Sequence, residues 1–419
     1  MASVNQHPGR VKKNLGNIKR TTENMSKRKI AIFTGNRAEY GLQYPIIKAI
    51  HSHPQLEYYL LVSGAHLQEN FGYTVKEIEQ DGFKVHREVK LDMPSDDLFG
   101  TAQAIGSGIL SLSQILKDLK PDILVVYADR FEGFAAVITG TQMGIPTAHI
   151  EGGDITEGGA LDDMVRHAMT KLAHLHFTTN ADASLRITKM GEEPWRIYTV
   201  GFPAIDVIME GRYAKPVEIQ EKYHIDLNRP VVLYTQHSIA TEFKQAGEQI
   251  IPALNALSNL AAEGLQVVMT FPNNDAGSSL IVDCLKALDV NKKKNIQLHA
   301  SLGRYFYHGF LSLCGRVGRG VCVGNSSSGI KETVAFGCPT VNIGDRQKGR
   351  LRALNVIDVD YDENKIYAAI KRCIEDKDFR HLCQTCENPY GTGDAGKKIA
   401  ETLAGVPLDL KLLQKKMTY

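Results

Sequence analysis

The chain has 419 residues, of which 43% are hydrophobic and 23% are charged. Its 49 lysines and arginines nearly balance its 47 aspartates and glutamates, so the formal net charge is only +2. A nucleic-acid-binding protein is usually more basic, and neither a run of about 18 apolar residues nor an apolar secretory leader is evident. We therefore expect a cytoplasmic globular protein without nucleic-acid or membrane partners, long enough for two domains.

Residues 1–28 form a basic segment without apolar periodicity. We expect a disordered tail here, because such a composition buries little apolar surface. An organelle-targeting peptide or a polybasic contact is the alternative. The charged residues of this segment are Arg10, Lys12, Lys13, Lys19, Arg20, Lys27 and Arg28, with Glu23 as the single acid.

The seven cysteines are odd in number and lie in the second half of the chain, which does not fit a disulfide framework. Cys383 and Cys386 form one C-x-x-C pair, but neither a second pair nor a suitably spaced histidine completes a zinc site. We therefore expect no bound metal. The other cysteines are Cys284, Cys314, Cys322, Cys338 and Cys373.

Residues 29–205 alternate short apolar runs with longer amphipathic stretches, a pattern that predicts strand–helix–strand units and a parallel sheet. The predicted strands are Lys29–Thr34, Tyr58–Val62, Ile123–Tyr127 and Thr147–Ile150. The predicted helices lie near Leu42–His51, Leu98–Leu119, Phe131–Met143 and Leu161–Leu172. This segment is predicted to be one α/β domain.

Residues 206–403 repeat the pattern and predict a second α/β domain. Its predicted strands are Val231–Tyr234, Val267–Phe271, Ile296–His299, Val321–Val323, Thr340–Ile343 and Val356–Val359. We expect the last helix, Ala395–Leu403, to pack back across the hinge, and residues 404–419 to form a tail. Ligands of open parallel sheets bind beyond the carboxyl ends of the strands, so the residues that follow the strands are the candidates for a site.

Two strand ends carry groups suited to phosphate. Arg37 follows the first strand within a glycine turn at 35–40, where it either holds a phosphate or is a surface arginine at a helix start. In the second domain, residues 324–329 read G-N-S-S-S-G and open a helix, so Ser326 and Ser327 can receive a phosphate. The alternative is a serine-rich helix cap that needs no ligand.

Other polar residues extend this rim of the second domain. Glu332 could accept hydrogen bonds from ribose hydroxyls, and Arg346 and Arg350 could close on a diphosphate. His237 and Asn273 follow two more strands and complete the rim. None of these residues would be notable alone.

Asp129 and Glu151 each follow a strand of the first domain, and parallel strands bring both to one rim. Two carboxylates there can divide general acid and base work, because burial and proximity separate their pKa values. Asp162 and Arg166 lie four residues apart on the next predicted helix and share a face, which favours a site. The alternative is that one carboxylate caps a helix and the other pairs with Arg130.

Two familiar nucleotide-binding motifs are absent or incomplete. No G-x-G-x-x-G follows the first strand, which disfavours a redox dinucleotide. Gly391–Lys397 reads G-x-x-x-x-G-K, but Lys398 stands where a magnesium-binding Ser or Thr belongs, and no strand precedes it. We interpret it as a turn before the last helix.

Together these motifs resemble the hydrolysing UDP-N-acetylglucosamine 2-epimerases. That family includes bacterial enzymes of sialic and legionaminic acid synthesis and the epimerase half of an animal bifunctional epimerase/kinase. The likeness extends from about Lys29 to Leu403. The segments that carry it are N-R-A-E-Y at 36–40, D-R-F at 129–131, H-I-E-G-G at 149–153, D-D and R-H at 162–163 and 166–167, Q-H at 236–237, F-P-N at 271–273, D-A-G-S at 275–278, G-N-S-S at 324–327, R-Q at 346–347 and N-P-Y-G at 388–391.

The resemblance implies two Rossmann-like domains with a cleft between them, as in GT-B glycosyltransferases, and UDP held mainly by the second domain. It also implies a UDP-sugar as substrate, no cofactor or metal, and a homo-oligomer, either a dimer or a tetramer. The implied substrate-binding residues are Arg37, His66, Arg130, Arg166, Asn273, the backbone of Ala300, Ser326, Ser327, Glu332 and Arg346. The implied catalytic residues are Asp129, Glu151, Asp162 and His237.

The implied reaction converts UDP-N-acetylglucosamine, or a 2-acetamido analogue such as UDP-N,N'-diacetylbacillosamine, into UDP and a free N-acetylmannosamine-type sugar. Because the proton on C2 is barely acidic, a carboxylate can remove it only while the bond from C1 to the diphosphate is breaking. Cationic stabilisation of the leaving group by the arginines, His237 and the serines is therefore required. Water then adds to the glycal intermediate.

Three other functions stay open. A non-hydrolysing 2-epimerase would return a UDP-linked product, and its relatives carry G-T-R-P-E and G-H-R loops, where this chain has G-N-R-A-E at 35–39 and Q-H-S at 236–238. A GT-B glycosyltransferase would need an acceptor site that no motif indicates, and a nucleotide-sugar sensor would not need the carboxylates. Glu39, Gly41 and Tyr127 depart from the animal enzyme and affect details near the sugar.

Overall fold

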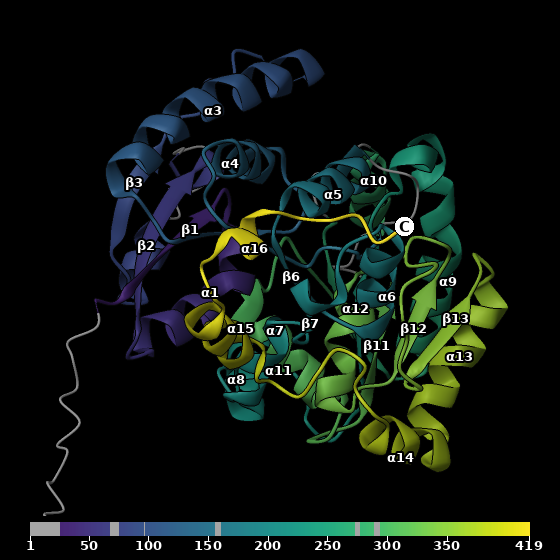
Figure 1. The fold of residues 1–419 in the computed structure, drawn as a ribbon. Helices are drawn as coiled ribbons and strands as arrows, with labels where there is room; N and C mark the ends of the chain where they lie inside the picture. Colours follow the sequence, from purple (N-terminus) through teal and green to yellow (C-terminus); the bar gives the residue numbers. More distant parts are fainter. Residues whose placement is uncertain (1–25, 68–74, 96, 156–160, 273–276, 289–293) are drawn as a thin grey trace, which may run out of the picture.

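The computed structural model describes residues 26–67, 75–95, 97–155, 161–272, 277–288 and 294–419. They form two α/β domains, each built on one parallel sheet covered by helices (Figure 1). The α/β fold class with two such domains is confirmed. Of the tail predicted at 1–28, residues 1–25 lie outside the described residues, and Arg28 already belongs to the first strand.

The first domain contains a seven-stranded sheet in the order β3-β2-β1-β4-β5-β6-β7. Its strands are β1 (Arg28–Thr34), β2 (Leu56–Ser63), β3 (Val85–Val89), β4 (Ile123–Tyr127), β5 (Thr147–Ile150), β6 (Leu175–Thr178) and β7 (Ile197–Thr199). Its helices are α1 (Arg37–Ser52), α2 (Val75–Gln80), α3 (Leu98–Leu119), α4 (Phe131–Gln142), α5 (Leu161–Leu172) and α6 (Ala181–Lys189), with short 3-10 turns at Gly64–Leu67 and Pro194–Arg196.

The second domain contains a six-stranded sheet in the order β10-β9-β8-β11-β12-β13. Its strands are β8 (Val231–Thr235), β9 (Gln266–Thr270), β10 (Ile296–His299), β11 (Gly320–Gly324), β12 (Thr340–Ile343) and β13 (Val356–Val359). The remaining helices are α7 (Ala204–Met209), α8 (Pro216–Tyr223), α9 (Ala246–Ala262), α10 (Ser278–Ala287), α11 (Gly303–Cys314), α12 (Ser328–Lys331), α13 (Glu363–Glu375), α14 (Lys377–Thr385), α15 (Ala395–Gly405) and α16 (Leu410–Leu413), with 3-10 turns at Ala240–Gln245 and Thr333–Phe336.

Each sheet has one point where the order of strands reverses, between β1 and β4 in the first domain and between β8 and β11 in the second. Such a switch point opens a crevice beyond the carboxyl ends of the strands. Gly324, at the end of β11, has a φ of 127°, and a Cβ there would lie 1.8 Å from the carbonyl oxygen of Thr235. Only glycine therefore allows β8 and β11 to meet this closely.

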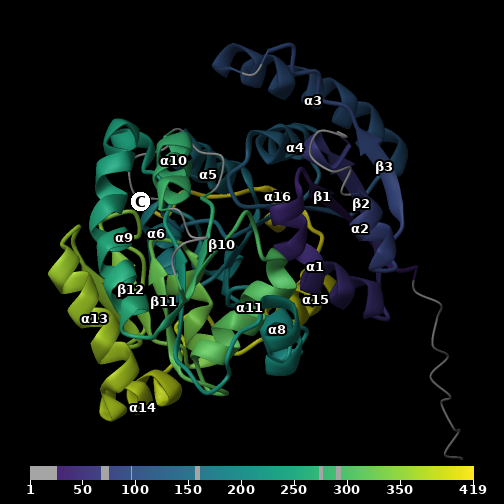
Figure 2. The same ribbon diagram turned by 180° about the vertical axis from the view of Figure 1, so that it is seen from behind.

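The sheets are buried on both faces, as parallel sheets usually are. Helices α3 and α4 cover one face of the first sheet, and α1 and α15 pack on the other. The apolar side of α15, with Ile399 and Leu403, belongs to the core of the first domain although the helix follows the second in sequence. Figures 1 and 2 show α1 and α15 side by side. The returning helix thus ties the two domains together.

The segment after α15 contacts the first domain as well. Arg28 donates a hydrogen bond to the carbonyl oxygen of Val406 at 3.0 Å, and Arg196 donates to that of Leu412 at 2.7 Å. The yellow C-terminal segment crosses the first domain in Figure 1. No helix in the described part of the chain is long and apolar enough to cross a membrane.

The buried carboxylate of Asp206, which is distant in the sequence, caps the N-terminus of α15. It accepts hydrogen bonds from the backbone N–H groups of Ala395, at 3.0 Å, and Gly396, at 2.8 Å. Asp206→Ala would leave both donors without an acceptor and should lower the free energy of unfolding by about 2 kcal/mol. Urea denaturation measures this loss.

Asp362, which caps the more exposed helix α13 through the N–H of Lys365, offers a matched control. Asp362→Ala removes one partly solvated hydrogen bond and should cost about 1 kcal/mol or less. An equal or smaller loss for Asp206→Ala than for this control would contradict the role assigned to Asp206.

Candidate active site

A cavity of about 690 Å³ lies between the two domains. Six of the residues expected from the sequence line it: His237, Ala300, Ser326, Ser327, Glu332 and Arg346. The first domain contributes the opposite wall, with Tyr40, Gly41, Leu42, Glu77 and Asp81. Its volume falls in the range of small-molecule sites.

The second-domain wall is assembled where strands end. A reciprocal pair of hydrogen bonds joins the ends of β8 and β11: the N–H of His237 donates to Oδ1 of Asn325 at 2.7 Å, and Nδ2 of Asn325 donates to the carbonyl oxygen of His237 at 2.9 Å. Arg346, which follows β12, donates to the carbonyl oxygen of Asn325 at 3.2 Å. Asn325 therefore sets the relative positions of the imidazole, the serines and the arginine.

The serine hydroxyls are not used as a helix cap. Ser327 occupies the N-cap position of α12, yet in the part of the chain that the structure describes its side chain makes no capping bond. The hydroxyl of Ser326 lies 3.1 Å from that of Ser328, which in turn lies 2.5 Å from the hydroxyl of Tyr307. Since α12 has only four residues, its helix dipole is small, and the hydroxyl groups are the stronger candidates for binding an anion.

His237 is neutral rather than cationic. Burial, together with the charge of Arg346, lowers the pKa of His237 to about 3. At neutral pH this imidazole can donate one N–H hydrogen bond but adds no charge, unlike the cationic group expected from the sequence. Arg346 is thus a cation of this wall.

Several contacts of the cavity were not anticipated. His308, on α11, holds the carboxylate of Glu332 at 2.8 Å. Arg304, on the same helix, donates to the carbonyl oxygen of Gly41 at 3.1 Å and so links the two walls. Tyr40 donates to Asp81 at 2.8 Å. His308 and Arg304 lie on a helix without a motif, so only the packing of the domains identifies them.

Asp129 and Glu151 end neighbouring strands on a strained backbone. Ala128, just before Asp129, has a φ of 53°, and Glu151 itself has a φ of 63°. Left-handed conformations of residues other than glycine are uncommon and cost free energy, and they concentrate at functional sites. His149 stabilises the first of these turns, because its Nε2 contacts the carbonyl oxygen of Ala128 at 2.6 Å.

Each carboxylate is paired with a buried cation. Asp129 forms an ion pair with Arg166 of α5, and Glu151 forms one with Lys331 of α12. Arg130 instead pairs with Glu132, at 3.3 Å. The alternative considered from the sequence, in which Arg130 neutralises one carboxylate, is therefore wrong. Neither Asp129 nor Glu151 is among the described residues that line the cavity.

A chain of contacts nevertheless connects both carboxylates to the cavity. Arg166 donates to the carbonyl oxygen of Asp154 at 3.0 Å, and the carboxylate of Asp154 shares Lys331 with Glu151. Glu332, the next residue along the chain, lines the cavity. The acids of the first domain and the candidate anion-binding groups of the second thus meet at α12.

The other expected residues are placed as follows. Buried His66 lies 3.2 Å from the hydroxyl of Thr34, and burial lowers its pKa to about 4. Asp162 lies exposed in the first turn of α5. Arg37 is the first residue of α1, but its side chain lies outside the described part of the structure, as does Asn273. Arg350, expected near a diphosphate, donates to the carbonyl oxygen of Ile155 at 2.9 Å.

Two departures from the animal enzyme are buried close to the carboxylates. Burial, with the nearby charge of Glu132, raises the pKa of Glu39 well above its ordinary value. Gln43 donates to Glu39 at 2.6 Å. Tyr127 is buried near Glu151, and burial raises the pKa of Tyr127 as well. Among the described residues, no cluster of three or more potential metal ligands occurs.

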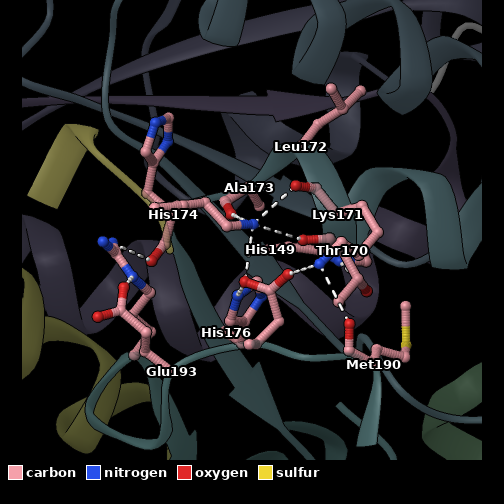
Figure 3. A network of polar contacts seen from close by, with 12 residues as sticks. His149, Thr170, Lys171, Leu172, Ala173, His174, His176, Met190 and Glu193 are labelled. Atoms are coloured by element: carbon pink, nitrogen blue, oxygen red, sulfur yellow. Dashed lines mark hydrogen bonds and ion pairs between the residues drawn. The ribbon is translucent and has the colours of Figure 1, made fainter. Parts of the chain in front are cut away.

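Helix α5, which supplies Asp162 and Arg166, is held at its far end by the C-terminal segment. The ammonium group of Lys415 donates to the carbonyl oxygens of Lys171, at 2.7 Å, and Ala173, at 2.6 Å, where a helix end favours a cation. It also pairs with buried Glu192 at 2.7 Å. Figure 3 shows this network around Lys171, Ala173 and His176.

Glu192 depends on its partners for its charge. Burial alone would raise its pKa, but hydrogen bonds from His176, Lys171 and Lys415 lower it to about 2. Because this value lies below the ordinary value of 4.5, the carboxylate stabilises the fold above pH about 5, and that stabilisation is lost as the pH falls toward 2.

Lys415→Met should therefore lower the free energy of unfolding at pH 7 by about 2–4 kcal/mol, because it leaves a buried carboxylate short of a cation and uncaps α5. The neighbouring Lys416 is exposed, and Lys416→Met should cost less than about 0.5 kcal/mol. Denaturant unfolding of the two variants measures the difference. Equal stabilities would contradict the role of Lys415.

Comparison with known proteins agrees with this geometry. Residues 48–404 match a family model described as UDP-N-acetylglucosamine 2-epimerase. The UDP-N,N'-diacetylbacillosamine 2-epimerase (hydrolyzing) of Legionella pneumophila is 30% identical over 94% of this chain and 100% of its own length. The GDP/UDP-N,N'-diacetylbacillosamine 2-epimerase (hydrolyzing) of Campylobacter jejuni is 32% identical over 92% of this chain and 97% of its own.

A solved structure supports the fold. The UDP-GlcNAc 2-epimerase of Neisseria meningitidis, bound to UDP-GlcNAc, superposes with a TM-score of 0.74 and 21% identity, covering 90% of this chain and 99% of that one. Because the family model spans most of the chain and curated relatives match along nearly their whole length, the protein belongs to the UDP-N-acetylglucosamine 2-epimerase family.

Proposed function

We propose that the protein is a hydrolysing 2-epimerase, which converts a UDP-linked 2-acetamido sugar into UDP and the free 2-epimer. The observation that carries this proposal is the meeting, at α12, of the cavity lined by Ser326, Ser327 and Arg346 with the ion network of Asp129 and Glu151. Two relatives at 30% and 32% identity bear the description hydrolyzing.

Departure of the diphosphate is the first requirement of this reaction. Hydroxyls of Ser326 and Ser327, the guanidinium of Arg346 and the neutral imidazole of His237 surround the cavity in which we place it. His237 and Arg346 are held by hydrogen bonds to Asn325, so these two residues need little reorganisation when negative charge develops on the leaving oxygen. We expect Glu332, whose carboxylate is held by His308, to bind the ribose hydroxyls.

Removal of the C2 proton accompanies this departure. A carboxylate among Asp129, Glu151 and Asp162 takes the proton, the electrons of the C2–H bond form the C1–C2 double bond, and the C1–O bond breaks to release UDP. A proton then returns to C2 from the opposite face, and water supplies the hydroxyl at C1. The two faces require two proton donors or acceptors, and the first domain provides more than one carboxylate.

Incubation in deuterated water with UDP-N-acetylglucosamine, and in parallel with UDP- and GDP-N,N'-diacetylbacillosamine, tests the reaction. NMR should detect UDP or GDP and a free mannose-configured sugar that carries deuterium at C2. Deuterium at C2 of a sugar still linked to the nucleotide would indicate a non-hydrolysing epimerase. Absence of any deuterium incorporation with all three substrates would refute the proposal.

Variants should separate the two halves of the site. Asp129→Asn, Glu151→Gln and His237→Ala should each lower kcat by at least ~10²-fold, because each removes acid/base function or stabilisation of the leaving group. Ser327→Ala should mainly weaken UDP binding, by about 1.5–3 kcal/mol for a hydrogen bond to a charged group. Isothermal titration and steady-state kinetics measure the two effects. Near-normal turnover in all three of the first variants would exclude this site.

A further inference from the structure

Lys331 is the least expected charged residue at the meeting point of the domains. Its side chain is only 4% exposed, and its ammonium group contacts the carboxylates of Glu151 and Asp154, both from the first domain. No sequence motif singled it out, because it follows the serine segment as one more residue of a short helix. Its partners show that it is an interdomain cation.

The backbone of Lys331 is tied to the anion-binding segment. Its N–H donates to the carbonyl oxygen of Ser327 at 2.9 Å. Ser327 and Glu332 both line the cavity, so Lys331 lies within one helical turn of the groups proposed to hold the nucleotide. A single turn of helix is rigid on this scale. The backbone of Lys331 is therefore held next to Ser327, while the ion pairs with Glu151 and Asp154 hold its ammonium group.

The surroundings of Lys331 belong to the hinge. The ammonium group lies 4.9 Å from the centre of the Phe202 ring and 5.9 Å from that of Tyr390. Phe202 lies where the chain first passes from one domain to the other and Tyr390 where it returns, and the N–H of Phe202 donates to the carbonyl oxygen of Tyr390 at 2.7 Å. Both aromatic faces favour a cation in this place.

Asp154 and Arg350 complete the charge balance. Burial would raise the pKa of Asp154, but the charges of Lys331 and Arg350 outweigh it, and the pKa lies below its ordinary value. Arg350, which belongs to the second domain, also donates a hydrogen bond to the carbonyl oxygen of Ile155 of the first domain. Because Arg350 also compensates the charge of Asp154, Lys331 can form an ion pair with Glu151 as well.

We infer that Lys331 is a positioning residue for catalysis: it holds the carboxylate of Glu151 at a fixed distance from the diphosphate bound by Ser327. This inference rests on the proposed function and extends it. It names the contact across the hinge that fixes the distance between the acid/base group and the leaving group. A displacement of about 1 Å between such groups can cost about 10²-fold in rate. Lys331 acts through Glu151 and does not itself touch the substrate.

The test compares Lys331→Met, Lys331→Gln and Lys331→Arg with the wild-type protein, using release of UDP and the free sugar for kcat and isothermal titration for the Kd of UDP. Loss of the charge in the Met and Gln variants should lower kcat by at least ~30-fold and change the Kd by less than about threefold. Arginine can bind both carboxylates, so Lys331→Arg should restore at least about a third of kcat.

Lys48 offers a matched control. It pairs with Glu210 at 2.8 Å and also joins α1 to the segment after the hinge, but the pair is exposed. Lys48→Met should leave both kcat and the Kd within about twofold of wild type, since exposed pairs contribute little. A comparable loss of kcat in this control would show that any weakened domain contact suffices, and would overturn the specific role of Lys331.

The outcomes separate the inference from the proposed function. A wild-type protein that releases no free 2-epimer refutes the function itself. A wild-type protein that does so, with Met and Gln variants that keep more than a third of its kcat, refutes only the role of Lys331. A parallel fall of kcat and UDP affinity would assign Lys331 to nucleotide binding instead. If the Met variant does not fold, the Gln variant, which keeps a hydrogen-bond donor, gives the same decision.

Discussion

The arrangement of the two domains depends on a few buried charges that the domains share. Lys331 of the second domain is surrounded by Glu151 and Asp154 of the first, and Arg166 continues the network to Asp129. Removing such charges from water is costly, and the cost is offset only when every partner is present in good geometry. An alternative orientation of the domains would leave one of them buried and alone. The network therefore selects one relative position of the two halves of the cleft.

The strained backbone at Ala128 and Glu151 is likewise stabilised by buried partners. The left-handed conformations of Ala128 and Glu151 persist because neighbouring groups fix them. His149 contacts the carbonyl oxygen of Ala128, and the N–H of Glu151 donates to the carbonyl oxygen of Phe177 at 2.9 Å. Burial lowers the pKa of His149 to about 4, so the imidazole is neutral and suited to this buried place. The same local features that turn the chain sharply at two strand ends also bring both carboxylates to one edge.

Much of this architecture could be predicted from the sequence. The parts that were missed lack a local sequence pattern. Buried strands such as Ile123–Tyr127 and Thr340–Ile343 are short apolar runs, and the structure has them at the predicted residues. Strand β3, with the sequence V-H-R-E-V, was missed because it is an edge strand with polar, partly exposed residues. Strands β6 and β7 were also missed, since they have only four and three residues. Serine and arginine residues of the cavity follow strands and were anticipated, whereas His308, Arg304 and Lys331 lie on helices, where only tertiary packing gives them a role.

The two groups of charges at α12 suit the two parts of the proposed chemistry. A diphosphate leaving group needs hydrogen-bond donors and a cation. Proton removal at C2, by contrast, needs a carboxylate that stays ionised while partly buried, which requires its own cation. Here Arg346 lines the cavity, and Arg166 and Lys331 pair with the acids. Because Lys331 and Glu332 are consecutive, the backbone joins these two environments directly at the end of α12.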